Sequence, residues 1–345
     1  MGRRACAIGV YANDEDRALA AQDKGFEGVA CVDDAARGVV LLLDLWHDTS
    51  DRRLRDWAVG LLDFVLCLQR DDGRFHNFIQ SWDGTINRDG PTSYAGGGTF
   101  WQARAVRALA KAHLLLRDPR VALPLARGFA FATDNPAAPD VRSIQVIAAL
   151  DLVRVGLTPV LRETLERWCD EIAECRIGDA LLNSADERTT PHLWAHVQEG
   201  ALADAAMVLD RPDLLEVARR SAATLITPQI EAGFPESTVQ PYGVASAVYV
   251  MDRLYQATNE SGYAKWRDHA RAWFDGRNAA EKPVYDRKNG RVLDGIDAGK
   301  LNPHSGAESN IVGAQALFHD IAPRARAMLD EVSDRLDIVV DGEAA

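Results

Sequence analysis

Carboxylates at the starts of two predicted helices are the residues best placed to do chemistry. Asp33 and Asp34 open an apolar helical segment, and Glu308 opens the last such segment of the chain. Glu236 is a further acid, in the long loop that precedes another apolar helix. Two carboxyl groups on opposite sides of a glycosidic bond can donate a proton and activate a water molecule. We therefore treat Asp33, Asp34, Glu236 and Glu308 as candidate catalytic residues.

The same acids have ordinary structural roles open to them. Asp33 has the position of a helix N-cap and Asp34 that of a first-turn acid, and each role contributes about 0.5–1 kcal/mol. Arg37 lies four and three residues beyond these acids, so it can pair with either. A helix N-terminus lowers the pKa of a carboxyl group, which favours a base or a hydroxyl acceptor over a proton donor. Ser305 and Glu308 fit the S-x-x-E capping box, although residues 307–310 are polar in an otherwise apolar helix.

A pair of histidines raises the question of a metal ion. His192 and His196 are one helical turn apart, and Glu199 follows one turn later. This spacing can hold a metal, but the pair lacks the glutamate of the H-E-x-x-H motif. Hydrogen-bonded pocket residues are the simpler interpretation. The sequence therefore predicts neither a metal ion nor a cofactor.

Aromatic and short polar side chains gather in the same long loops as the acids. Flat rings suit the C–H faces of sugars, and short polar groups read their hydroxyls. In segment 71–78 a turn at Asp72-Gly73 precedes alternating aromatic and polar residues, which either form one wall of a sugar subsite or pack against helix ends. The candidate substrate-binding residues are Arg37, His76, Asn77, Trp82, Tyr94, Trp101, His196, Glu199, Tyr242 and His304.

The overall charge and the missing motifs exclude other classes. The chain has 39 Lys+Arg against 51 Asp+Glu, a net charge of −12, so its surface repels nucleic acid. This charge suits a neutral glycan better than a polyuronate, although Arg37, Arg74 and Lys300 could reverse the preference locally. No phosphate-binding G-x-x-x-x-G-K-[ST], dinucleotide-binding G-x-G-x-x-G or nucleophile G-x-S-x-G motif occurs.

Helical periodicity runs through most of the chain, and helices of two kinds alternate. One kind is apolar nearly all round, as helices surrounded by protein are. These are 34–46, 99–116, 141–154, 192–209, 242–256 and 306–318. The other kind has one polar face. These are 51–69, 119–132, 160–175, 212–226, 262–275 and 323–337.

Six buried and six amphipathic helices in strict alternation predict an all-α fold, an (α/α)6 toroid with an inner and an outer ring. We expect one domain over residues 1–345, with an N-terminal arm at 1–25 and a disordered tail at 338–345. The long connections, at about 70–98, 177–191, 227–241 and 276–305, all lead to the N-terminal ends of the inner helices. Long loops in a compact domain usually carry function, so the site is expected at that rim.

Compartment and membrane association follow from simpler features. Five cysteines form no C-x-x-C pair and are odd in number, which argues against a disulfide framework and favours a cytoplasmic protein. The apolar stretch near the N-terminus barely reaches the minimum length for a signal peptide and is followed at once by charged residues, so export is not expected. No run of about 18 uncharged apolar residues predicts a membrane span.

Three short segments resemble those of a known superfamily. Residues 32–37 (VDDAAR), 73–78 (GRFHNF) and 306–309 (GAES) are similar to the D-D-x-A-R, G-x-F-x-N-F and G-A-E-S segments of the six-hairpin glycosidase-like domains that accompany some bacterial glycosyltransferases. The resemblance implies an (α/α)6 fold and a carbohydrate ligand. Many six-hairpin enzymes act by inversion, with one acidic and one basic carboxyl group.

Together these features predict a glycoside hydrolase that acts on an oligosaccharide or polysaccharide at the rim. We expect Glu308 or Glu236 as the proton donor and Asp33 or Asp34 as the base, with aromatic side chains holding the sugar. A non-catalytic glycan-binding toroid is the main alternative. A phosphorylase would result if phosphate replaced water, and an isoprenoid-cyclase-like toroid is disfavoured because the rim is polar. Oligomeric state is not readable from the sequence.

Overall fold

The computed structural model describes residues 5–11, 27–95, 99–187 and 191–331. Its inner ring consists of six helices whose apolar side chains face neighbours on most sides, as the sequence predicts. These are α1 (Val32–Thr49), α3 (Phe100–Leu116), α5 (Pro139–Val153), α7 (Gln198–Leu209), α10 (Pro241–Thr258) and α12 (Ala307–Ala316).

The outer helices are amphipathic, and three of them start at a side-chain N-cap. Asp118 is the N-cap of one and Thr158 the N-cap of another. Each is followed by a proline, whose fixed φ angle suits the first position of a helix. The outer helices are α2 (Arg52–Cys67), α4 (Pro119–Asp134), α6 (Pro159–Glu174), α8 (Pro212–Ser221) and α11 (Ser261–Arg271). A π-helical turn (Ala222–Ile226) continues α8 into α9 (Thr227–Glu231).

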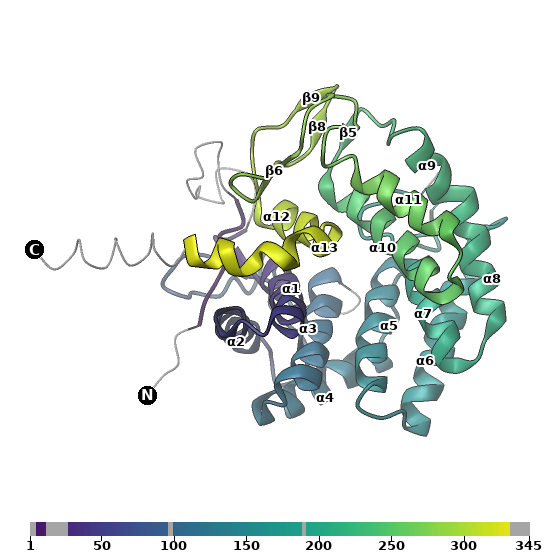
Figure 1. The fold of residues 1–345 in the computed structure, drawn as a ribbon. Coiled ribbons are helices and arrows are strands. Elements are labelled where there is room, and N and C mark those ends of the chain that lie inside the picture. Colours follow the sequence, from purple (N-terminus) through teal and green to yellow (C-terminus); the bar gives the residue numbers. More distant parts are fainter. Residues whose placement is uncertain (1–4, 12–26, 96–98, 188–190, 332–345) are drawn as a thin grey trace, which may run out of the picture.

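The chain closes into a ring. Each inner helix packs against the next, and α12 packs against α1, so the first and last hairpins are neighbours. Figure 1 shows this closure, with yellow α12 beside purple α1. Outside α12, α13 (Phe318–Ile321) and a 3-10 turn (Ala322–Arg324) lead into a helical segment at 325–331. The rest of the predicted helix 323–337, and the predicted tail, lie outside the described residues. The predicted (α/α)6 toroid is confirmed.

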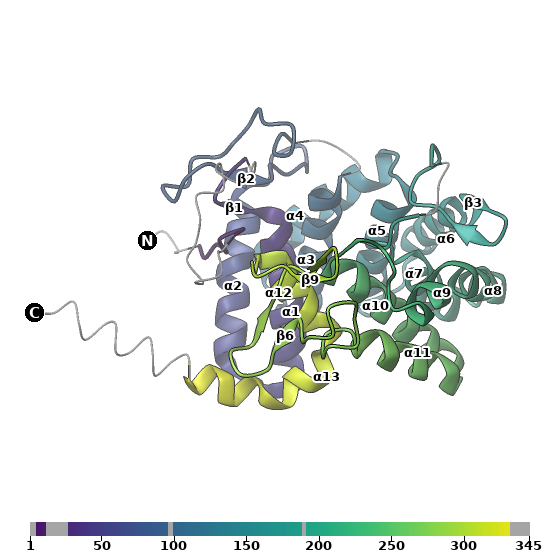
Figure 2. The same ribbon diagram turned by 90° about the horizontal axis from the view of Figure 1, so that it is seen from above.

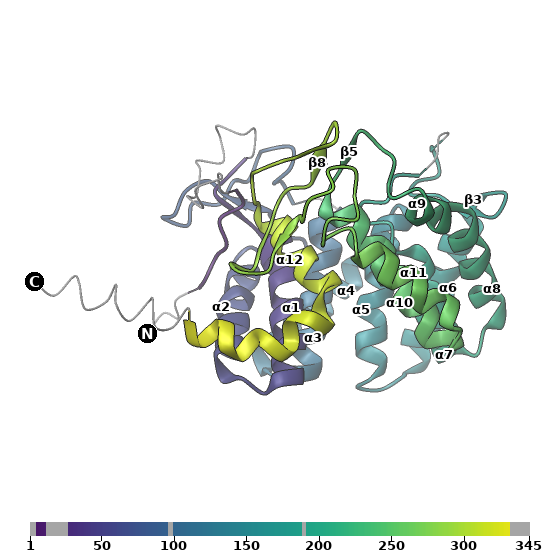
Figure 3. The ribbon, with the colours of Figure 1, turned by 45° about the horizontal axis from the view of Figure 1, so that its top comes forward.

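Short strand pairs decorate one end of the ring (Figures 2 and 3). Each strand has two residues, too few for the alternating pattern that reveals strands in a sequence. All pairs are antiparallel, and, except for the first strand, which directly precedes α1, the strands lie in or at the edge of the long connections predicted above. They are β1 (Ala30–Cys31) with β2 (Phe78–Ile79), β3 (Arg176–Ile177) with β4 (Ala180–Leu181), β6 (Tyr285–Asp286) with β7 (Arg291–Val292), and β8 (Ile296–Asp297) between β5 (Thr238–Val239) and β9 (Lys300–Leu301).

The core lies between the two rings. One large cluster packs around Trp168, Trp273 and Phe274, and a second packs around Phe75 and Leu109. The described part of the N-terminal arm is tied to this body, because the Val10 carbonyl accepts a hydrogen bond from the Ala307 N–H. Among the described residues, no helix is long and apolar enough to cross a membrane.

One inner helix starts later than the sequence indicates. The apolar segment 192–209 predicts a helix from His192, whereas α7 begins at Gln198. Ala195 adopts a left-handed backbone with φ of 56°, which interrupts any helix through this segment. Residues 192–197 therefore belong to the rim, which changes the surroundings of both histidines.

Candidate active site

Arg37 gathers three carboxylates at the decorated rim. Its guanidinium lies 3.4 Å from Asp33 Oδ2, 3.6 Å from Asp34 Oδ1 and 2.5 Å from Glu308 Oε1. The two aspartates reach Arg37 because residues three and four positions apart share a helix face. Glu308 reaches it because α12 packs beside α1 with its N-terminus at the same rim. We call Asp33, Asp34, Arg37 and Glu308 the Arg37 cluster.

A second arginine fixes one of these acids. Arg104 Nη1 donates to both carboxylate oxygens of Asp33, at 2.6 and 2.5 Å. The Arg104 guanidinium also lies 4.9 Å from the centre of the Phe100 ring, one turn earlier on α3. Asp33 is therefore held between two guanidinium groups, and its side chain keeps about one fifth of its surface exposed.

The cluster brings two exposed acids close together. Arg37 Nη2 contacts both Asp33 Oδ2 and Glu308 Oε1, so these oxygens lie no farther apart than the sum of the two distances, about 6 Å. The Glu308 side chain is 38% exposed, and that of Asp33 is 21% exposed. An acid and a base could therefore approach one ligand from these two positions.

The neighbouring aspartates have pKa values shifted in opposite directions. Burial raises the pKa of Asp33, but the Arg104 and Arg37 guanidinium groups outweigh it and lower that pKa below its ordinary value. Burial also raises the pKa of Asp34, against the opposing effect of Arg37 and with help from Asp33 and Glu308, to about 7. Asp33 is therefore ionised at neutral pH, whereas Asp34 exchanges a proton there.

The capping roles considered for these acids belong to other residues. Cys31 is the N-cap of α1, where its sulfur accepts from the Asp34 N–H. Gly306 is the N-cap of α12, and its N–H donates to Asp294 Oδ1. Ser305 Oγ donates instead to the Val292 carbonyl, so no capping box forms. Glu308 is thereby available to Arg37.

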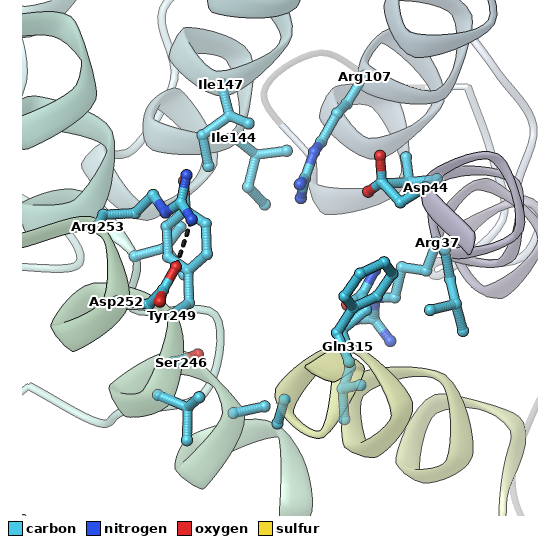
Figure 4. A pocket seen from close by; sticks show the side chains of 18 of the residues that line it. Arg37, Asp44, Arg107, Ile144, Ile147, Ser246, Tyr249, Asp252, Arg253 and Gln315 are labelled. Carbon is cyan, nitrogen blue, oxygen red and sulfur yellow. Dashed lines mark hydrogen bonds and ion pairs between the residues drawn. The ribbon is translucent and has the colours of Figure 1, made fainter. Parts of the chain in front are cut away.

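A cavity of about 520 Å³ opens beside the cluster, between the inner helices. Arg37, Arg104, Glu308 and Tyr242 line its rim end, and Figure 4 looks into its centre. Burial, followed by the negative charges of Glu308 and Asp294, raises the pKa of Tyr242 to about 12, so its hydroxyl remains a donor. The volume lies in the range of small-molecule sites.

Aromatic rings flank the acids at the same rim. The His192 and Trp194 rings stack at 3.9 Å with an angle of 3° between their planes. Trp194 lies 5.4 Å from the Phe100 ring, which carries Arg104 on its face. Trp194 is 41% exposed, so it offers a flat apolar surface next to polar groups.

Three predicted substrate-binding residues instead hold in place the loop that contacts the start of α1. Asn77 Oδ1 accepts from the Asp33 N–H, and the Asn77 carbonyl accepts from the Val32 N–H. Trp101 Nε1 donates to the Phe75 carbonyl. His76 is buried, and burial together with Arg88 and Arg70 lowers its pKa. These residues anchor the loop that holds the start of α1.

His196 and Glu199 are sealed inside the protein, which corrects the expectation that they contact substrate. His196 Nδ1 lies 2.6 Å from Asn183 Oδ1, and its Nε2 lies 3.0 Å from Glu199 Oε1. The Ser221 hydroxyl donates to the same Glu199 oxygen at 2.5 Å. Both side chains have no exposed surface. A sugar therefore cannot reach them. Their hydrogen bonds join the start of α7 to Ser221 at the end of α8 and to Asn183, just after the β3–β4 hairpin.

Asp34 also departs from its predicted role. The residue is 4% exposed, whereas the Asp33 side chain is 21% exposed, so Asp34 cannot meet substrate directly. Its Oδ2 accepts from the Cys31 thiol at 3.3 Å. Asp34 therefore acts on the cluster through its charge and not as the group that touches a ligand.

The remaining candidates lie at the rim without joining the cluster. Trp82 and Tyr94 are half exposed or more, and Glu236 is exposed. No hydrogen bond, ion pair or ring contact within the described residues links these three to Arg37. The His304 ring lies 5.4 Å from that of Tyr11, and the His304 carbonyl accepts from the Asp294 N–H.

Sequence reasoning missed Arg104, Asp294 and the Phe100 platform. Arg104 carries a weak signal, since it is a charged residue inside an otherwise apolar segment. Asp294 had no signal beyond its place in a long loop. Its role depends on the N-terminus of α12, which only the folded chain brings near it.

No family model and no curated protein sequence matches the chain. Solved structures match its fold. A D-mannose isomerase has a TM-score of 0.67 at 9% identity, over 93% of this chain and 91% of that one. A sugar epimerase from a ruminal bacterium has a TM-score of 0.68 at 13% identity, over 93% and 94%. A GH76 α-mannanase from Bacteroides thetaiotaomicron has a TM-score of 0.58 at 12% identity, over 86% and 87%.

These neighbours share the closed double ring, and their names describe enzymes that act on sugars. Their identity to this chain is too low to transfer an activity. The resemblance seen in segments 32–37, 73–78 and 306–309 thus agrees with the structure at the level of the fold. The chain has the (α/α)6 fold of the six-hairpin glycosidase-like proteins.

Proposed function

We propose that this protein is a carbohydrate-active enzyme whose reacting groups are Asp33 and Glu308. The observation that carries the proposal is the Arg37 guanidinium, which holds acids from both ends of the chain at the mouth of a cavity. A polar rim with exposed aromatic rings fits a sugar better than an apolar substrate. The sugar-acting neighbours with the same fold support the same class.

Hydrolysis of a glycosidic bond is the activity we propose first. Arg104 and Arg37 keep Asp33 ionised, which suits a base that activates water. Glu308 is the more exposed acid, and Arg37 bridges it to Asp33. We assign it the role of the proton donor to the oxygen of the bond that breaks.

Epimerisation of a sugar is the second candidate, because two structural neighbours with this fold are a sugar isomerase and a sugar epimerase. The Asp33 and Glu308 oxygens lie within about 6 Å, which is shorter than the separation of about 6.5–9.5 Å in inverting hydrolases and compatible with that of about 5–5.5 Å in retaining ones. An epimerase needs no space for a water molecule, because its base takes a proton directly from a sugar carbon.

One experiment separates these activities. The purified protein is incubated with a panel of mono- and oligosaccharides in D2O, and the products are followed by NMR. Hydrolysis yields new reducing ends, and epimerisation places deuterium on a sugar carbon. Parallel samples with inorganic phosphate detect a phosphorylase through sugar 1-phosphate. Binding without any product would leave a glycan-binding toroid, and neither binding nor product would overturn the proposal.

A further inference from the structure

The cavity continues well below the Arg37 cluster. Its lining on α1 runs from Arg37 to Asp48 and on α10 from Tyr242 to Arg253. At 1.5 Å per residue each stretch is about 16 Å long. The cavity thus has a rim end, which the proposed function uses, and a deep part with charges of its own.

Most acids that line the deep part are paired with cations. Lys111 Nζ lies 3.0 Å from Asp44 and 3.3 Å from Asp151, so one lysine serves two carboxylates. Asp252 pairs with Arg253, and also with Arg267 at 3.0 Å. Each of these acids therefore has a cationic partner within the protein.

Arg107 has no ion pair of this kind within the described residues. It lies one turn below Arg104 on α3 and points into the centre of the cavity near Tyr249 and Ile144 (Figure 4). Its Nε is buried and has no hydrogen-bond partner in the part of the chain that the structure describes. Asp44 faces the same space, but its carboxylate is the partner of Lys111.

A guanidinium with a buried N–H group that has no hydrogen-bond acceptor is costly unless a ligand supplies one. Its planar fork of N–H groups matches the two oxygens of a carboxylate or phosphate. Ser246, Tyr249 and Gln315 line the same part of the cavity with neutral polar groups that suit sugar hydroxyls.

We propose that the cavity takes an anionic sugar, whose carboxylate or phosphate group binds Arg107 while the reacting end meets Asp33 and Glu308. This inference rests on the proposed function and names its substrate class. It revises the expectation of a neutral glycan, which came from the net charge of −12. That charge describes the whole surface, whereas the potential inside a cavity is set by the side chains that line it.

Matched pairs of sugars test the proposal by calorimetric titration. The pairs are D-glucose with D-glucuronate, D-galactose with D-galacturonate, and D-mannose with D-mannose 6-phosphate, and inorganic phosphate is titrated alone. We expect the anionic member of at least one pair to bind about tenfold tighter or more than its neutral partner. Arg107→Gln should abolish that preference and leave the affinity of the neutral sugar within about twofold, whereas Arg107→Lys should retain part of it.

Arg154→Gln is the matched control, because Arg154 is exposed, lines the same cavity and has no ion pair within the described residues. It should leave the preference intact. Melting temperatures show whether each variant folds, and Arg107→Gln should melt no lower than the parent.

Four results would overturn the inference. Equal affinities in every pair would do so, as would an anion preference that survives Arg107→Gln. Loss of the preference in Arg154→Gln would show that it depends on general charge. Competition by inorganic phosphate with every anionic sugar at equal affinity would assign the position to a free ion. If neutral sugars bind and react without an anion preference, the proposed function stands, and if no sugar binds at all, both fail.

Discussion

The starts of two inner helices carry acids beside a basic partner and use them in opposite ways. At the start of α1, Asp33 and Arg37 meet Glu308 of α12 at the mouth of the cavity, and both acids remain partly exposed. At α7, His196 and Glu199 meet with no exposed surface. The first group faces the cavity between the inner helices, and the second faces α8 and the segment that follows the β3–β4 hairpin. Residue type therefore shows where charge gathers, and position around the helix decides whether a ligand can reach it.

The largest effect is expected from a substitution of Glu308, the more exposed acid of the Arg37 cluster. Glu308→Gln should lower the turnover of whatever sugar reaction the D2O panel reveals by about 10²–10⁴-fold, because an amide cannot transfer the proton. Its melting temperature should stay close to that of the parent, since Glu308 is partly exposed. Glu236→Gln, at the same rim but outside the cluster, should keep turnover within about twofold. Comparable losses in both variants would contradict the assignment.

The sealed group should respond in stability instead. Glu199→Ala leaves His196 and Ser221 without their buried partner, so the free energy of unfolding should fall by about 2–4 kcal/mol. Chemical denaturation measures this loss, and turnover under native conditions should change little. Glu216→Ala, which breaks an exposed ion pair with Arg220 on α8, should leave the free energy of unfolding nearly unchanged. A large loss of turnover in Glu199→Ala at unchanged stability would reverse the comparison.

Asp34 tests the boundary between the two groups, because it is buried yet belongs to the accessible cluster. Its pKa is raised from 3.8 to about 7, so the folded protein holds a proton that the unfolded chain has released. Stability gained from that proton is present below about pH 4 and is lost as the pH rises to about 7. Asp34→Asn keeps a neutral side chain and should lack this decrease. Parallel pH profiles of unfolding free energy for parent and variant would show that the pKa is not raised.

The aromatic platform should give the smallest effect. Trp194→Ala removes the exposed ring that stacks on His192, and substrate affinity should fall by about 3–10-fold with turnover at saturation unchanged. Trp82→Ala removes a ring of greater exposure, which makes no contact with the cluster within the described residues, and the same affinity should change less than twofold. Steady-state kinetics separates the two parameters. An equal effect of both variants would extend the sugar site across the whole rim.

Local patterns in the sequence determined much of this protein. The alternation of buried and amphipathic helices follows from side-chain periodicity, and the pairing of Arg37 with Asp33 and Asp34 follows from helical spacing. Both are short-range properties, because one turn of a helix brings these residues together whatever the rest of the chain does. The decorated rim followed in the same way from connection lengths.

Only the tertiary structure decided which groups share a site. The Arg37–Glu308 pair exists because the last hairpin closes the ring against the first, and Arg104 reaches Asp33 because α3 packs beside α1. The burial of each acid could not be predicted from the sequence either. Glu199 and Glu308 both lie in the first turn of an apolar helix, and they differ only in the direction that their side chains face. A helix pattern records which residues lie on one face, but it does not record which neighbour that face will meet.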